Sequence, residues 1–140
     1  MQLMQLEMET NSLVYESITS NDPFDAALTH DLEIKFDTMP GTFIAMYARI
    51  GDRGFAILSD DIDFSHEKYI LALCLYYHLK QQPKILLRSG PIDEDFSALD
   101  FAYDLLSFGV SREEGETPDE YDSRIGIPEL IRRRQLERLN

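Results

Sequence analysis

One apolar run near the middle of the chain limits its possible folds more than any other feature. The run YILALCLYYHL covers residues 69–79 and leaves almost no polar face. A helix that is apolar on all sides is usually a central helix that other elements cover, and this run is too short to span a bilayer. We therefore predict a buried central helix over residues 65–80, with Ser65 as its N-cap and Glu67 in its first turn.

The segments around this helix predict short strands and further helices. Asp22 followed by Pro23 is typical of a helix start. The predicted fold class is α+β, with a small, partly antiparallel sheet packed against the central apolar helix and further helices. In chain order we expect a helix at 23–30, strands at 32–36, 42–50 and 55–58 with a hairpin turn at 51–54, the central helix, a short strand or extended loop at 84–88, and helices at 92–108, 119–124 and 128–139.

The chain of 140 residues is long enough for one domain with its own core. We expect residues 1–21 to be a frayed N-terminal segment or to include a short strand at 13–18. Residues 22–140 are expected to form a single domain, with a helical C-terminal portion from about residue 118 to 140.

The formal net charge of −13 disfavours direct binding of nucleic acid, because such a surface repels phosphate groups. Cys74 is the single cysteine, so no intrachain disulfide can form and a reducing compartment fits the sequence. The N-terminus lacks the basic start and the long apolar run of a signal peptide. We therefore expect a cytoplasmic protein that has no membrane partner.

The charge is unevenly distributed along the chain. Residues 124–140 contain five arginines against two glutamates. Either this is a solvated basic helix end, which is the favoured interpretation because helix C-termini attract cations, or it is a docking surface for an acidic partner. The candidate partner-binding residues are Arg132, Arg133 and Arg134, together with the acidic pair Asp60 and Asp61.

The sequence contains one tempting but incomplete metal motif. His66 and Glu67 resemble the start of HExxH, in which two histidines four residues apart share one helix face and bind zinc. Ile70 occupies the position of the second histidine, and His78 lies about 120° away around an ideal helix. We therefore predict surface or capping histidines, a core position for Cys74, and no cofactor or metal.

The order of features along the chain also matches the pattern of a known family. It combines a Pro-Gly turn, a hairpin with an apolar returning strand, an apolar helix, an Ala-rich helix and a Gly-hydrophobic-Pro segment before a basic helix. The matching stretches are 30–34, 39–41, 55–58, 69–72, 98–106 and 125–128, followed by Arg134, Leu136 and Leu139. In this order the chain resembles the ImmA/IrrE family of zinc metallopeptidases.

The chain departs from this family at the residues that perform the chemistry. In the matching register Leu73 and Tyr77 stand where the family has its two histidine ligands, and Cys74 stands where it has the catalytic glutamate. The third ligand position falls near Asp95, with Glu94 beside it. A catalytic zinc site needs three protein ligands and a base. The resemblance therefore implies a zincin-like fold without peptidase activity, whereas a coincidental α+β pattern is the alternative.

The resemblance also implies a function, because members of this family commonly act on helix-turn-helix repressors. The leading hypothesis is a pseudoenzyme that regulates transcription by binding such a repressor, as an antirepressor of a phage or other mobile element. A second hypothesis is a metal-dependent hydrolase that uses Asp60, Asp61, His66 and Glu67. A third is a structural subunit of a larger complex. The sequence leaves the oligomeric state open.

Overall fold

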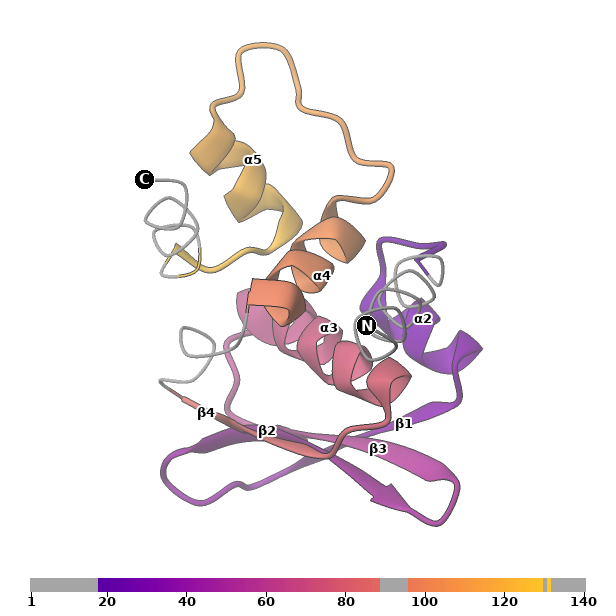
Figure 1. Cartoon of the computed structure of the whole chain (residues 1–140). Coiled ribbons are helices and arrows are strands. Elements are labelled where there is room, and N and C mark those ends of the chain that lie inside the picture. The colour runs from indigo at the N-terminus through magenta and orange to yellow at the C-terminus, as the bar shows by residue number, and fades with distance from the viewer. Residues whose placement is uncertain (1–17, 89–95, 130, 132–140) are drawn as a thin grey trace, which may run out of the picture.

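The computed structural model describes residues 18–88, 96–129 and 131 (Figure 1). These residues form a mixed four-stranded sheet and four helices, which confirms the predicted α+β class. In chain order the elements are α2 (Pro23–Thr29), β1 (Leu32–Asp37), β2 (Phe43–Ile50), β3 (Arg53–Ser59), α3 (Phe64–Lys80), β4 (Lys84–Leu87), α4 (Phe96–Ser107) and α5 (Pro118–Ile125). Residues 13–17 of the predicted strand at 13–18, the first residues of the 92–108 helix and most of the 128–139 helix lie outside the described residues, and residue 18 is not in a strand.

The sheet has the strand order β1-β3-β2-β4. β2 and β3 form the expected antiparallel hairpin, and its turn contains Gly51 at a φ of 64°. The turn is shorter than expected, because β3 already begins at Arg53. β4 pairs with β2 in antiparallel orientation, whereas β1 pairs with β3 in parallel orientation. The sheet is therefore partly antiparallel, as predicted, and both outer strands depend on the central hairpin for their hydrogen bonds.

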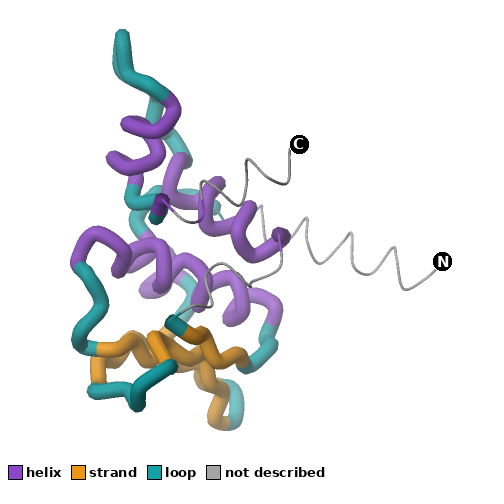
Figure 2. The backbone as a smooth tube through the Cα atoms, turned by 90° about the vertical axis from the view of Figure 1, so that its left-hand side faces the viewer, coloured by secondary structure: helices purple, strands orange, loops and turns teal. Residues whose placement is uncertain are grey.

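All described helices lie on one side of this sheet (Figures 1 and 2). α3 lies directly over the strands with α2 beside it, α4 lies over α3, and α5 is farthest from the sheet (Figure 1). The inner face of the sheet contributes apolar side chains to the core beneath α3, among them Ala45, Tyr47, Ala56, Leu58 and Leu86. The opposite face of the sheet is not covered by any described element.

The predicted central helix is confirmed as α3. Every residue from 69 to 77 is buried, because the sheet covers one side of the helix and α4 and α2 cover the others. The predicted N-cap was wrong, since the carboxylate of Asp63 accepts the backbone N–H of Ser65 at 3.1 Å. Ser65 lies inside the first turn, where it cannot cap the helix. The helix ends at Gln81, which adopts a left-handed conformation with a φ of 55°.

The two shorter helices at the ends of the domain begin as the sequence predicts. Asp22 caps α2 by accepting the N–H of Phe24, and Pro23 occupies the first helical position. α5 begins with a capping box in which Thr117 and Glu120 bond each other's backbone N–H groups. These caps fix where the helices start, and so they fix the walls of the groove described next.

Candidate functional site

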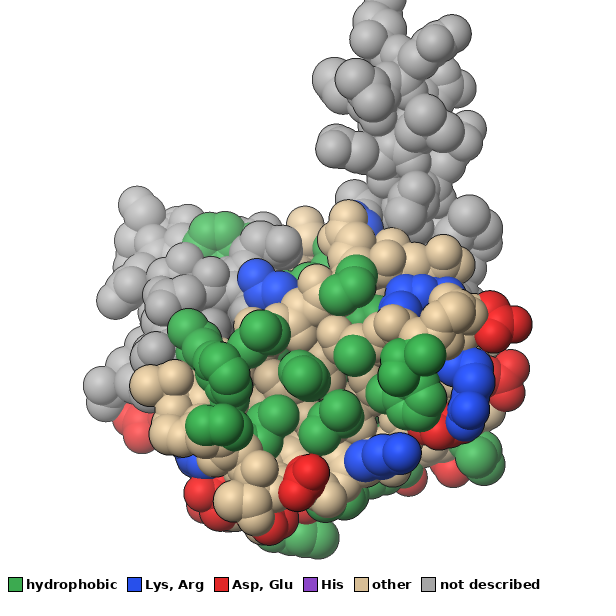
Figure 3. Space-filling view, turned by 90° about the horizontal axis from the view of Figure 1, so that it is seen from below, with side chains coloured by type: hydrophobic (Ala, Val, Ile, Leu, Met, Phe, Trp, Pro, Cys, Tyr) green, Lys and Arg blue, Asp and Glu red, His purple; other side chains and the backbone are tan. Residues whose placement is uncertain are grey.

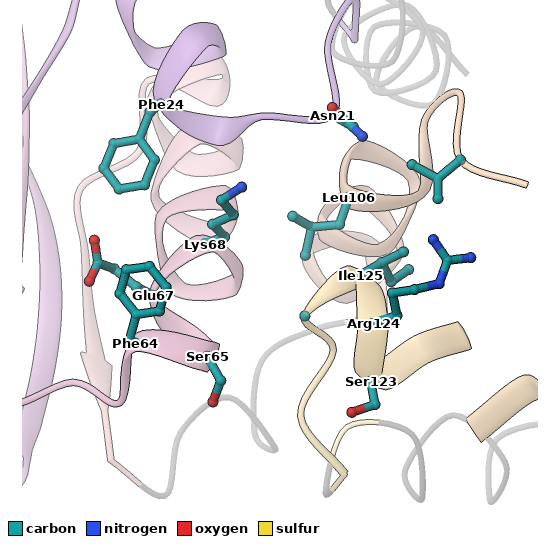
Figure 4. Close-up of a pocket in the computed structure, with 12 residues that line it drawn as sticks. Asn21, Phe24, Phe64, Ser65, Glu67, Lys68, Leu106, Ser123, Arg124 and Ile125 are labelled. Atoms are coloured by element: carbon teal, nitrogen blue, oxygen red, sulfur yellow. The ribbon is translucent and has the colours of Figure 1, made fainter. Parts of the chain in front are cut away.

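A groove with a volume of about 520 Å³ lies where the first turns of α3 face α2, α4 and α5 (Figure 4). It is a concave surface built from several helices, and it opens to solvent. Its lining residues are Asn21, Phe24, Phe64, Ser65, Glu67, Lys68, Leu106, Val110, Ser123, Arg124, Ile125 and Gly126.

Two aromatic side chains form one wall of this groove. Phe24 comes from α2 and packs partly on the core, whereas Phe64 is the first residue of α3 and is 86% exposed. Both lie on the same side of the cavity, across from Leu106 of α4 and Ile125 of α5 (Figure 4). A phenylalanine this exposed at the rim of an apolar groove is more informative than an isolated exposed apolar residue, because it extends a surface that can exclude water.

The charged residues of the groove differ in their exposure and in whether they are already paired within the protein. Lys68 is exposed, and its side chain extends from α3 into the space between the walls (Figure 4). Glu67 lies half-buried beside Phe64. Arg124 is already paired within the protein, because its guanidinium donates to both carboxylate oxygens of Glu116 at 2.7 and 2.8 Å.

This pairing of Arg124 with Glu116 holds α5 in place. The guanidinium also donates to the carbonyl of Ser111 at 3.0 Å, so it joins the last turn of α5 to the loop before this helix. Its hydrogen bonds lower the pKa of Glu116 to about 2. The available charges of the groove are therefore those of Lys68 and Glu67.

The positions at which the resemblance would place a metal site lie in the core. Leu73 and Cys74 are completely buried, and Tyr77 is 5% exposed. None of the three lines the groove. Burial in apolar surroundings disfavours the thiolate of a cysteine. The fourth position, Asp95, lies outside the described residues.

Asp60 and Asp61 join strand ends instead of meeting at the groove. Asp61 accepts two hydrogen bonds from Arg88, both at 2.8 Å, and another from the hydroxyl of the buried Ser59. The hydrogen bonds from Ser59 and Arg88 lower the pKa of Asp61. Asp60 accepts the hydroxyl of Thr38 at 3.0 Å. These contacts tie the end of β3 to the residues after β1 and β4.

The remaining candidate residues are also separated. His66 lies in the first turn of α3, where its N–H donates to the carbonyl of Asp63. Within the described ranges, no three His, Cys, Asp or Glu side chains lie close enough together to bind a metal ion. Of the four residues in the hydrolase hypothesis, only Glu67 lines the groove. Arg132, Arg133 and Arg134 lie outside the described residues.

A hydrogen-bonded cluster at the other end of α3 was missed by the sequence prediction. His78 was expected at the surface or as a cap, but it is half-buried, and its Nε2 lies 2.7 Å from the carbonyl oxygen of His30. Its Nδ1 lies 2.8 Å from the hydroxyl of Tyr47, and the oxygen of that hydroxyl accepts a hydrogen bond from Arg49 at 2.9 Å. Burial lowers the pKa of His78. The signal that could have revealed this cluster was Gly54, since a glycine inside a strand often marks a close approach, but the prediction placed Gly54 in the turn at 51–54 and the structure places it in β3.

No helix within the described ranges is both long and apolar enough to cross a membrane. Comparison with known protein families, with characterised proteins and with solved structures gives no match to this chain.

Proposed function

We propose that this protein is a non-catalytic, zincin-like binding protein that regulates transcription by holding a helix-turn-helix repressor, as an antirepressor does. The observation that carries this proposal is the groove at the start of α3, with the exposed Phe64 at its rim. The proposal combines that surface with the resemblance to the ImmA/IrrE family and with the charge of the chain.

The groove suits an amphipathic helix of a partner protein. Such a helix inserts a few apolar side chains into a groove and leaves its polar face in solvent. Phe24, Leu106 and Ile125 provide apolar walls, and Phe64 would become buried against the inserted side chains. Full burial of a phenylalanine side chain stabilises a complex by about 2 kcal/mol, and exposed aromatic residues of this kind are typical binding hot spots.

The residues at the degenerate metal positions support a binding role over a catalytic one. Leu73, Cys74 and Tyr77 take part in the apolar core between the sheet and the other helices. Their side chains fill volume that metal ligands and a base would need to keep polar and accessible. The chain resembles the family at positions that pack in the core, and it differs from the family at the positions of the metal ligands and the catalytic base.

The charge of the chain supports a basic partner. A repressor presents a basic surface to DNA, and a protein with a net charge of −13 attracts such a surface and competes with DNA for it. The protein would then act by withdrawing the repressor from its operator.

The test is to measure binding of purified helix-turn-helix repressors from the source cell to the full chain, and to ask whether the chain releases each repressor from operator DNA. Phe64→Asp places a charge at the rim of the groove and is expected to weaken binding by about tenfold or more, which corresponds to at least about 1.4 kcal/mol. Leu28→Asp is the matched control, because Leu28 is 80% exposed on α2 and does not line the groove.

Two results would contradict the proposal. One is that no DNA-binding protein is retained by the chain, or that both variants lose binding equally. The other is stoichiometric zinc after mild purification, with loss of that zinc in His66→Ala, which would favour the hydrolase hypothesis.

A further inference from the structure

The outer face of the sheet is a second surface, opposite the helices and separate from the groove. Figure 3 shows this face, where apolar side chains gather over the strands and charged side chains lie around them. Strand register assigns its residues, because the inner face consists of the alternate positions that pack under α3. A register shift between Phe43 and Ala45 interrupts the alternation, so Phe43 pairs with Leu87 on the outer face. The apolar side chains of the outer face are Phe43, Met46, Ala48, Ile50, Phe55, Ile57, Ile85 and Leu87.

Several of these side chains remain accessible in the described structure. Ile50 is 70% exposed, Ile85 is 51% exposed and Leu87 is 39% exposed. Phe55 is buried but does not belong to the core beneath α3. Its ring is covered instead by the side chains of Lys35 and Arg53, whose charged groups lie 5.3 and 5.2 Å from the ring centroid. An apolar face of this extent on a single sheet is typical of an interaction surface.

The charges around this face balance, although the whole chain is strongly acidic. β1 contributes Glu33, Lys35 and Asp37 to the outer face, and Arg53 of β3 pairs with Glu33. Arg88 and Asp61 form a second ion pair where β3 and β4 end. These six residues carry three positive and three negative charges, so the net charge of −13 is located on the rest of the molecule.

We propose that this face is the interface of a homodimer, in which the sheets of two copies pack face to face. A second copy is strongly acidic, and most approaches between two such copies are opposed by like charge. Because its charges balance, the outer face is a surface that two copies can bring together without that repulsion. The basic partner of the proposed function would be attracted to the acidic remainder of the molecule instead.

The size of the face sets the strength of this dimer. Four strands about 4.8 Å apart, with about six residues rising about 3.3 Å each, give a footprint of roughly 400 Å² per copy. Stable interfaces bury about 800 Å² of accessible surface per partner. Side chains that protrude from the sheet make its accessible area larger than the flat footprint, but not large enough to reach this value. The interface is therefore at the weak end of specific interfaces, and the dimer forms in a concentration-dependent equilibrium.

The test is sedimentation equilibrium of the full chain between about 5 and 500 µM, the range expected for weak interfaces of this size. The average mass is expected to rise from 16.2 kDa toward twice that value. Ile57→Lys, at the centre of β3, is expected to raise the dimer dissociation constant by about tenfold or more. Ile85→Lys on the edge strand is a second variant, since it changes a more exposed site. Leu28→Lys is the matched control and should dimerise like the parent chain.

Circular dichroism of each variant establishes that it is folded, and a thiol at position 46 tests the geometry. Cys74 is completely buried, so Met46→Cys introduces the accessible thiol among the described residues. A bifunctional thiol reagent that spans about 10 Å, the spacing of two packed sheets, should link two such chains if the faces pack together. The proposal is overturned by a chain that stays monomeric throughout the range, or by a dimer that persists in both folded lysine variants. Phe64→Asp must still dimerise, which separates this test from that of the groove.

Discussion

Gly54 lies beneath two side chains that leave no room for a methyl group. A Cβ at this position would overlap the ring of His78 and lie 2.8 Å from the hydroxyl of Tyr47. The close approach lets His78 reach from the end of α3 to the surface of the sheet. A residue that looks like part of a turn in the sequence is therefore a contact between two layers of the fold.

Gly54→Ala is expected to lower the free energy of unfolding by about 1–3 kcal/mol, because the ring must move and its hydrogen bonds must lengthen. Urea denaturation measures this change. Gly41→Ala is the control, since nothing lies within 4 Å of its Cβ, and it should change stability little. Equal stability of the two variants would show that His78 does not pack on Gly54.

The hydrogen bonds of His78 define which of its nitrogens carries a proton. The carbonyl of His30 can only accept, so Nε2 must donate to it. In the neutral ring Nδ1 then accepts from Tyr47, whose oxygen accepts in turn from Arg49. A proton on Nδ1 would leave the O–H of Tyr47 without its acceptor. It would also place a second positive charge near Arg49. The geometry therefore favours the neutral form, as does burial.

This preference predicts how stability depends on pH. The pKa of His78 is lower in the folded state than its ordinary value of 6.5, so the unfolded chain takes up a proton first as pH falls. The contribution of His78 to the free energy of unfolding is therefore complete above pH 6.5 and decreases as pH falls toward the folded pKa. Urea midpoints between about pH 5 and 8 should fall more steeply for the parent chain than for His78→Gln. Identical slopes would contradict the assignment.

At the scale of elements, the sequence predicts those helices whose position depends on neighbouring residues, and it does not predict which distant strands pair. The apolar run of α3 and the Asp-Pro start of α2 were both recognised, because period and capping are local properties. The parallel pairing of β1 with β3 was not predicted, since a whole strand separates them in sequence. Asp63 was missed as the cap of α3 because Ser65, two residues later, is an equally common capping residue.

The start of α5 offers a test at the same scale. Thr117 accepts the N–H of Glu120 at 3.1 Å, and Glu120 accepts the N–H of Thr117 at 3.1 Å. Thr117→Ala removes one half of this capping box and should cost about 1 kcal/mol of stability. Thr117→Ser keeps the hydroxyl and should be nearly neutral, as measured by urea denaturation. If both variants lost stability equally, the methyl group and not the cap would be responsible.

At the scale of the whole molecule, the groove could not be predicted from the sequence. Phe24, Phe64, Leu106 and Ile125 come from four different helices, and each looks like an ordinary core residue in its own segment. Hydrogen bonds from Tyr103 to Asp122 and from Tyr121 to the carbonyl of Val110 hold α5 beside α4, and together with the ion pair of Arg124 and Glu116 they bring the last wall into place. The candidate acidic pair, Asp60 and Asp61, instead binds Thr38 and Arg88 at the ends of strands. The outer sheet face was equally hidden, because its extent depends on the non-local strand order.

The strand order also relates folding to the direction in which the chain is synthesised. β1 lies at one edge of the sheet, and its hydrogen-bonding partner is β3, which pairs Gly54 with Leu32. β1 therefore leaves the ribosome before its partner exists, and it has no strand to bind until the hairpin of β2 and β3 has formed. β4 follows only after the whole of α3. Because such distant pairings close slowly, we expect β1 and β4 to join the sheet after the hairpin of β2 and β3, and apolar α3 is the first helix after that hairpin that can shield its inner face from water.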